Sequence, residues 1–213
     1  MKRNGQLLRG ARSIFLNGLL FRNPVLVGAL GLYPLVAAAR SVGSAAALSL
    51  LFLLLALPCG LILCFFGMLA PRWFRPGLVL LVSAACYPAA AALADLLLPG
   101  SVSGLGMAAG LMICNSAVYS RAEEYAPEHV AAAVLADAFG CSLGFAGVAF
   151  LLGALRGLWL TGSLPGAVLP PAGKGFDLPF AGFLMLGFLA ALLQWLNRRR
   201  AERAAERLKR RIP

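Results

Sequence analysis

Charged side chains are scarce in this sequence: they make up 13% of its 213 residues, whereas 61% are hydrophobic. The one histidine, His129, cannot build a metal site alone, and the cysteines form no CxxC pair. No glycine-rich nucleotide loop is present, and no arrangement of Ser, His and Asp typical of nucleophilic catalysis. These absences predict a chain with no catalytic residues of its own and no flavin or NAD site.

Long apolar stretches dominate the rest of the sequence. A helix needs about 20 apolar residues to cross a hydrocarbon core about 30 Å thick. Stretches of this length, two of them carrying a single acid (Asp95 or Asp137), occupy 44–70, 77–98, 101–120, 130–155 and 178–197. They predict an integral membrane protein built from helices.

A further apolar stretch, 24–39, precedes these and contains Gly28, Gly31 and Pro34. Helix breakers at membrane depth are tolerated only where neighbouring protein satisfies the backbone. We therefore expect a first transmembrane span that is broken near Gly31 to Pro34. The alternative for this region is a cleaved signal peptide that ends at the alanines 37–39.

Six spans predict an all-α integral membrane fold of six transmembrane helices. We expect two inverted three-helix repeats, about 17–98 and 101–197, with broken helices 1 and 4. Residues 1–197 would form a single membrane domain, and 198–213 a basic cytoplasmic tail.

The distribution of basic residues predicts the orientation in the membrane. With both termini on one side, that side holds all of the 19 Lys and Arg residues except Arg40, Arg156 and Lys174. Because basic residues favour the cytoplasmic side, we expect a multi-pass protein of the cell inner (cytoplasmic) membrane with both termini cytoplasmic. The net charge of +11 is thus clustered at the ends and does not indicate nucleic-acid binding. The tail is either a solvated helix or a segment that contacts anionic membrane lipids.

Two segments share the same spacing between a marked residue and an arginine, as expected for the leading helices of two repeats. In GLYPLVAAAR, Tyr33 precedes Arg40 by seven residues; in MICNSAVYSR, Cys114 precedes Arg121 by the same spacing. Each segment lies in the first span of its half, and the two halves are expected to enter the membrane from opposite sides.

Three stretches resemble the RnfE and NqrD membrane subunits of the Rnf/Nqr family. NPVLVGALGLYPLVAA is similar to their NPxLVQLLGLCPLLAV, and ICNSAVYSRAEEYA to VNCxILGRAExFA. LADAFGCSLGFAGVAFLLGALRGLWLTGSL resembles the following helix and loop, DGLGMGLGFTxxLxxxGxIREILGTGxL. The order and spacing agree from about residue 17 to residue 164.

The resemblance implies a membrane subunit of an ion-translocating oxidoreductase complex, itself non-catalytic, which carries electrons with a sister subunit (RnfA/NqrE-like). In that family each sister contributes two cysteines, and together they hold a [2Fe–2S] cluster. Cys114 stands at or beside the second cysteine position, next to Asn115, whereas Tyr33 replaces the first cysteine.

This departure leaves three outcomes open for the cluster. Three cysteines and Tyr33 could hold it; another thiol such as Cys59, Cys64 or Cys86 could compensate; or the cluster is absent and the subunit is a cluster-free scaffold. The missing ligand favours a lost or altered cluster.

Charged residues near the fourth and fifth spans complete the candidate site. Asp137 lies about two turns into its span, where an ionisable group is costly unless it is paired or wetted. It is either part of an ion path or a partner for Arg121, or it makes a structural hydrogen bond between helices. Asn115 and Glu123 belong to the same group of ion-path or structural residues. A rival interpretation of the whole chain is a secondary transporter with inverted repeats.

Overall fold

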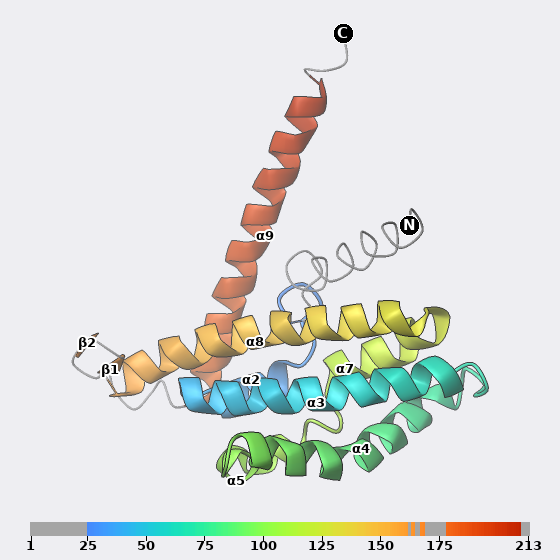
Figure 1. Cartoon of the computed structure of the whole chain (residues 1–213). Coiled ribbons are helices and arrows are strands. Elements are labelled where there is room, and N and C mark those ends of the chain that lie inside the picture. The colour runs from blue at the N-terminus through green and yellow to red at the C-terminus, as the bar shows by residue number, and fades with distance from the viewer. Residues whose placement is uncertain (1–24, 162, 165–166, 169–177, 210–213) are drawn as a thin grey trace, which may run out of the picture.

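The computed structural model describes residues 25–161, 163–164, 167–168 and 178–209, and the fold in this part is helical (Figure 1). In chain order the helices are α2 (Leu32–Ala38), α3 (Val42–Phe66), α4 (Arg75–Leu97), α5 (Ser101–Leu105), α6 (Met107–Gly110), α7 (Ser116–Ser120), a π-helix η2 (Arg121–Tyr125), a 3₁₀-helix η3 (Ala126–Glu128), α8 (Ala131–Thr161) and α9 (Pro179–Lys209). A minimal antiparallel hairpin of β1 (Ser163–Leu164) and β2 (Ala167–Val168) follows α8. The expected helical membrane fold is confirmed.

Among the described residues, 4 helices are long and apolar enough to cross a membrane: α3, α4, α8 and α9. The two other predicted spans are interrupted. Residues 25–38 contain only the short helix α2, and residues 101–120 are divided among α5, α6 and α7. The chain is therefore a multi-pass membrane protein in which two of the expected spans are not continuous helices.

The long helices begin where the sequence supplies suitable caps. Ser41 is the N-cap of α3, and its side chain accepts a hydrogen bond from the Ser44 backbone N–H at 3.2 Å. The Ser44 hydroxyl in turn accepts from the Ser41 N–H at 3.0 Å, which completes a reciprocal capping box. Pro76 lies in the first turn of α4, where the missing N–H would have had no partner within the helix.

Helices α3 and α8 form the centre of the bundle and pack antiparallel (Figure 1). At the middle of the pair the rings of Phe52 and Phe145 stack, with centroids 4.3 Å apart and an interplanar angle of 12°. Gly60 near the end of α3 lies against Val134 at the start of α8, and Gly153 near the end of α8 lies against Ser41. The absence of a side chain at both glycines allows the two helices to approach closely.

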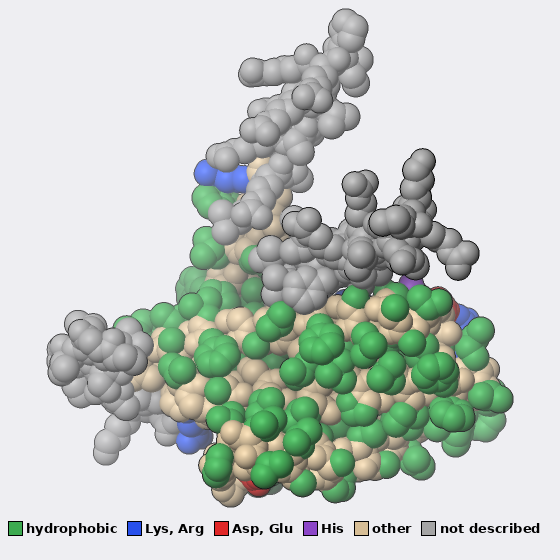
Figure 2. Space-filling view, viewed as in Figure 1, with side chains coloured by type: hydrophobic (Ala, Val, Ile, Leu, Met, Phe, Trp, Pro, Cys, Tyr) green, Lys and Arg blue, Asp and Glu red, His purple; other side chains and the backbone are tan. Residues whose placement is uncertain are grey.

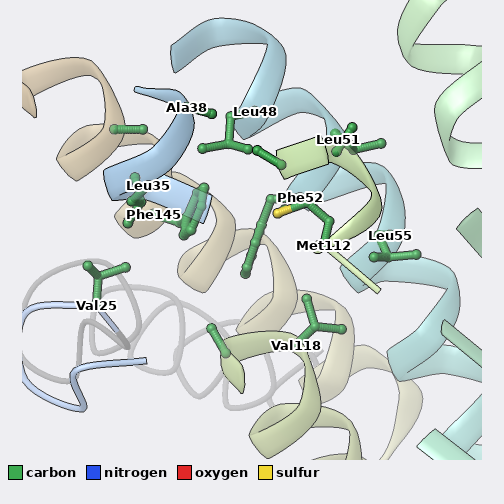
Figure 3. Packing of buried hydrophobic residues seen from close by; sticks show 14 of the residues in the cluster. Val25, Leu35, Ala38, Leu48, Leu51, Phe52, Leu55, Met112, Val118 and Phe145 are labelled. Carbon is green, nitrogen blue, oxygen red and sulfur yellow. The ribbon is translucent and has the colours of Figure 1, made fainter. Parts of the chain in front are cut away.

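The core around this stacked pair draws side chains from several segments (Figure 3). Leu35 of α2 and Met112, which precedes α7, are fully buried together with Phe52 and Phe145. The interrupted segments are thus packed into the core and are not peripheral loops.

The outer helices expose apolar side chains, as expected where lipid replaces water. The apolar window of α9 is 18% buried and that of α4 is 28% buried, against 56% for α8. Figure 2 shows hydrophobic side chains spread over the visible face of the bundle, with few charged groups among them.

Helix α9 contacts α2 and α8 near its beginning and then stands away from the other helices (Figure 1). It continues without a break past Asn197 to Lys209, so the tail that the sequence separates at 198 begins as an extension of this helix. Arg198 pairs with Glu202 at 3.1 Å and Arg199 lies over the Trp195 ring. This basic segment has the paired i,i+4 charges of a solvated helix.

Candidate functional site where the two interrupted segments meet

The first interruption lies at Gly31. This residue is the N-cap of α2 and has a φ of 69°, in the left-handed region that favours glycine. Pro34 lies in the first turn of α2, where its missing N–H costs no hydrogen bond within the helix. The break therefore lies at the start of the expected range, and the proline belongs to the helix that follows it.

The second interruption ends at Asn115, which is buried and is the N-cap of α7. Its side-chain oxygen accepts a hydrogen bond from the Ala117 N–H at 2.9 Å, and its amide nitrogen donates to the Met112 sulfur at 3.4 Å. Asn115 thus satisfies one of the free N–H groups at the helix start, which is essential away from water.

The two interruptions touch each other. The Gly31 N–H donates a hydrogen bond to the Ser116 hydroxyl at 2.8 Å. A Cβ atom at Gly31 would lie 2.9 Å from the Asn115 side-chain oxygen and 3.4 Å from the Phe145 ring. The N-terminal ends of α2 and α7 therefore meet directly beside the stacked Phe52–Phe145 pair, and we call this contact the crossing.

The predicted cluster residues flank the crossing on its exposed side. Tyr33 is 60% exposed, and Cys114 and Ser116 are also exposed. Ser116, whose hydroxyl contacts the other interruption, is a residue that the sequence did not single out. A ligand role for Cys114 stays a prediction.

A buried polar group lies next to the crossing. The Arg121 Nε is 3.6 Å from an Asp137 carboxylate oxygen, and the Cys141 thiol donates weakly to the same oxygen at 3.8 Å. Asp137 is 5% exposed. The structure thus brings together the two charged residues that the sequence proposed as partners, one from the start of η2 and one from α8.

The geometry of this ion pair leaves room between its two members. The N–O distance exceeds the range of a hydrogen bond, and the buried Arg121 Nε has no hydrogen-bond partner among the described residues. A cavity of about 20 Å³ is lined by Arg121, Asp137 and Cys141, together with Phe52 and small residues. A water molecule needs about 10–15 Å³ and several polar partners, so this cavity has the size and the lining for one bridging water.

Glu123 lies outside this buried group. It lines a cleft of about 500 Å³ together with Glu124, Glu128, Arg72 and Arg75. The cleft lies where the α3–α4 connection faces η2 and η3, which is the side that the charge distribution assigns to the cytoplasm. Glu123 therefore belongs to a mixed-charge surface and not to the Arg121–Asp137 cavity.

Two of the three possible compensating thiols, Cys59 and Cys64, contact polar groups, and the third, Cys86, packs against the hydrophobic core. The Cys59 sulfur lies 3.3 Å from the Ser83 hydroxyl, and Cys64 donates to the His129 carbonyl at 3.2 Å. All five cysteines are free. Within the described ranges, no group of three or more His, Cys, Asp or Glu side chains could hold a metal ion.

Arg156 is a residue whose burial the sequence did not predict. The charge distribution assigns it to the outer side of the membrane, and in the structure its side chain is fully buried on α8. Its Nη1 donates to the Val36 carbonyl at 2.7 Å and its Nη2 to the Leu178 carbonyl at 3.2 Å. Positive charge alone does not reveal burial, and only the packing of α2 and α9 against α8 shows that carbonyl groups surround this side chain.

Membrane-length helices around two interrupted segments define a multi-pass membrane protein with a broken-helix core. Residues 11–193 match the family described as "Rnf-Nqr subunit, membrane protein", and the chain belongs to this family. It is similar to the E subunit of the ion-translocating oxidoreductase complex of Edwardsiella ictaluri, with 30% identity over 92% of this chain and 91% of that protein. The proteins of the same description from Shewanella oneidensis (92% and 91% covered) and Vibrio cholerae (94% and 95%) are each 28% identical.

Proposed function

We propose that this chain is a membrane subunit of an ion-translocating oxidoreductase complex of the Rnf/Nqr type. Its similarity to the E subunits of such complexes, over nearly their whole length, supports this assignment. The observation that carries the proposal is the crossing, where Gly31 and Ser116 join two interrupted segments inside a helical bundle. No nucleotide or flavin motif is present in the sequence, so the complex's redox chemistry with soluble substrates belongs to other subunits.

The packing of α3 and α8 supports a fold of two inverted repeats. The same number of residues separates Gly60 from Gly153, Ser41 from Val134 and Phe52 from Phe145. A two-fold axis through the stacked rings would therefore exchange the Gly60–Val134 contact with the Gly153–Ser41 contact. The Gly31–Asn115 contact joins the N-caps of α2 and α7, the interrupted segments of the two halves, although fewer residues separate this pair. We infer two halves of opposite orientation, each led by a broken helix.

The exposed side of the crossing is the surface that we propose for the sister membrane subunit. Residues 27–29 of the first interruption and Gly110, Cys114 and Ser116 of the second are exposed. Non-helical backbone at membrane depth is tolerated only when protein or a water-filled cavity covers it. Lipid tails cannot form hydrogen bonds with exposed backbone N–H and C=O groups. We therefore propose that another membrane-embedded chain, the sister subunit, covers this surface.

The residues of this chain do not fit their expected share of a [2Fe–2S] cluster. Two sister chains would each supply two thiolates. At the crossing this chain offers one thiol (Cys114), one phenol (Tyr33) and the Ser116 hydroxyl, which already accepts the Gly31 N–H. Cys59 and Cys64 contact other groups. We propose that the subunit is a cluster-free scaffold of the complex.

We assign Asp137 and Arg121 to an ion path through this subunit. Asp137 is the only buried carboxylate among the described residues, and a buried ionisable group in a membrane span is costly unless it is paired or wetted. The cavity beside it admits one water. An ion or proton on this path would take the place of that water beside the Asp137 carboxylate. The positive charge of Arg121 would partly offset the negative charge of the carboxylate.

We also propose an orientation of the chain in the membrane. The basic ends of the chain favour an inner-membrane location with both termini in the cytoplasm. The side of Glu123, Glu124 and Glu128 then faces the cytoplasm, and the connection between α8 and α9 faces the opposite side.

The test starts from the intact complex, purified through a tag on this chain. Co-purification with other membrane and redox subunits, and coupled ion uptake in liposomes, are expected. If the chain purifies alone and transports a solute without electron transfer, the assignment is wrong and the inverted-repeat transporter replaces it.

Iron and labile sulfide are then counted in the complex from cells with the native chain and with Cys114→Ala. Equal counts are expected, since the chain holds no cluster. A loss of two irons and two sulfides per complex in the variant would refute the cluster-free assignment and identify Cys114 as a ligand.

A further inference from the structure

The guanidinium of Arg156 joins three helical segments at a buried point. Arg156 itself lies on α8, Val36 lies in the last turn of α2, and Leu178 immediately precedes α9. The bonds to Val36 and Leu178 both run to backbone carbonyls, at 2.7 Å and 3.2 Å. An arginine in this position can serve several segments at once because its donors are held in a rigid planar fork.

The Val36 carbonyl needs a donor because α2 ends in the interior of the bundle. The last four carbonyls of a helix have no partner within it. Here the Leu35 carbonyl accepts the Ala39 N–H at 2.9 Å, and the Ala38 carbonyl accepts the Arg40 N–H at 2.8 Å. Arg156 serves the carbonyl of Val36, which lies between them. Its positive charge also faces the negative end of the helix dipole, which adds to the stabilisation.

The start of α9 leaves space for this contact. A Cβ atom at Gly182 would lie 3.4 Å from the Arg156 Nη1 and 3.1 Å from a Val36 methyl carbon. A glycine at this position therefore allows α9 to close over the guanidinium without displacing it from α2.

We propose that Arg156 is a positioning residue for the crossing. The half-helix α2 is short, at 7 residues, and an isolated helix of this length is not stable by itself. Its N-terminal end is held by the Gly31–Ser116 bond and its C-terminal end by Arg156. Arg156 thus fixes the direction of α2, and with it the placement of Gly31 against α7. This role concerns the geometry of the broken helix and does not depend on the proposed redox function.

A nitroxide label on Tyr33→Cys tests the proposal in the full-length chain, with the native cysteines replaced by alanine and the protein in nanodiscs. Tyr33 is exposed on α2, so the label reports the mobility of this helix. A second label, on Leu81→Cys of α4, controls for general loosening, because Leu81 is also exposed and lies far along the chain from Arg156.

In Arg156→Gln the mobile fraction at position 33 is expected to rise about threefold or more, because the charge-assisted bond to Val36 is lost. Arg156→Lys keeps the charge but lacks the planar fork, so it should restore the native spectrum only in part. Arg75→Gln is the matched control: Arg75 also donates to a backbone carbonyl, that of Ala70 at 3.2 Å, but on α4. It should leave position 33 unchanged.

An unchanged spectrum at position 33 in a folded, monodisperse Arg156→Gln chain would overturn the proposal, as would equal changes at positions 33 and 81. If Arg156→Gln does not fold, Gly182→Ala replaces it, because the added methyl group crowds the Val36 side chain at 3.1 Å and touches the guanidinium at 3.4 Å while the charge remains. A smaller rise at position 33 is then expected, and the absence of any rise rejects the role.

Discussion

The contact between the two interruptions can be tested by one methyl group. In Gly31→Ala the new Cβ would lie 2.9 Å from the Asn115 side-chain oxygen and 3.4 Å from the Ala117 Cβ, closer than an ordinary contact in the first case. The residue must also keep a φ of 69°. The left-handed conformation costs a non-glycine residue about 1–2 kcal/mol, and overpacking in a well-packed site costs about 1–3 kcal/mol more.

Gly100→Ala separates these two contributions. Gly100 is also a helix N-cap, with a φ of 78°, but a Cβ atom there would meet only the Ser103 hydroxyl at 3.8 Å. It therefore carries the conformational cost without the crowding. We expect Gly31→Ala to lower the free energy of unfolding by about 2–5 kcal/mol, and Gly100→Ala by about 1–2 kcal/mol.

The assay is reversible unfolding of the full-length chain in mixed detergent micelles, followed by far-ultraviolet circular dichroism. The difference between the two losses in free energy of unfolding measures the cost of crowding at the crossing. Equal losses of stability in the two variants would show that Gly31 does not touch α7, and the argument for a joined pair of broken helices would fail.

Three further predictions follow from the same region. Asp137→Asn should lower coupled ion uptake by the intact complex at least tenfold with assembly retained; full coupled uptake in the variant would exclude Asp137 from the ion path. Phe52→Ala should destabilise the chain by about 3–5 kcal/mol by opening a cavity beside Phe145, whereas Phe180→Ala, at a 70% exposed position, should cost far less in micelles; similar losses would contradict the assigned core. Ser116→Ala should cost about 1 kcal/mol by removing the acceptor of the Gly31 N–H, and Ser116→Thr, which keeps a hydroxyl, should retain more of the native stability.

Much of the fold could be predicted because membrane helices are visible directly in the sequence. Apolar stretches of spanning length predicted α3, α4, α8 and α9, and the break at Gly31 followed from a glycine and a proline in an otherwise apolar run. The pairing of Arg121 with Asp137 was one of the alternatives that the sequence offered, since a buried carboxylate requires a partner.

The site was harder to predict where a residue's role depends on distant segments. Cys114 was the predicted ligand because it is a thiol beside Asn115, but the residue that contacts the other interruption is Ser116. The burial of Arg156 was not predicted for the same reason: a sequence gives the charge of a residue and its neighbours along the chain, but not the carbonyls that enclose it.

The sequence alone determined that this chain crosses a membrane several times, where its first span is broken, and to which family of subunits it is related. Hydropathy, helix breakers and motif spacing are local properties, so they can be read along one dimension. Only the tertiary structure decided that the two interruptions touch, that Phe52 stacks on Phe145 beside them, and that Arg156 donates to the Val36 carbonyl at the end of α2. These contacts join segments far apart in the chain, and they form only when α3 and α8 pack closely enough to bring both broken helices to one place.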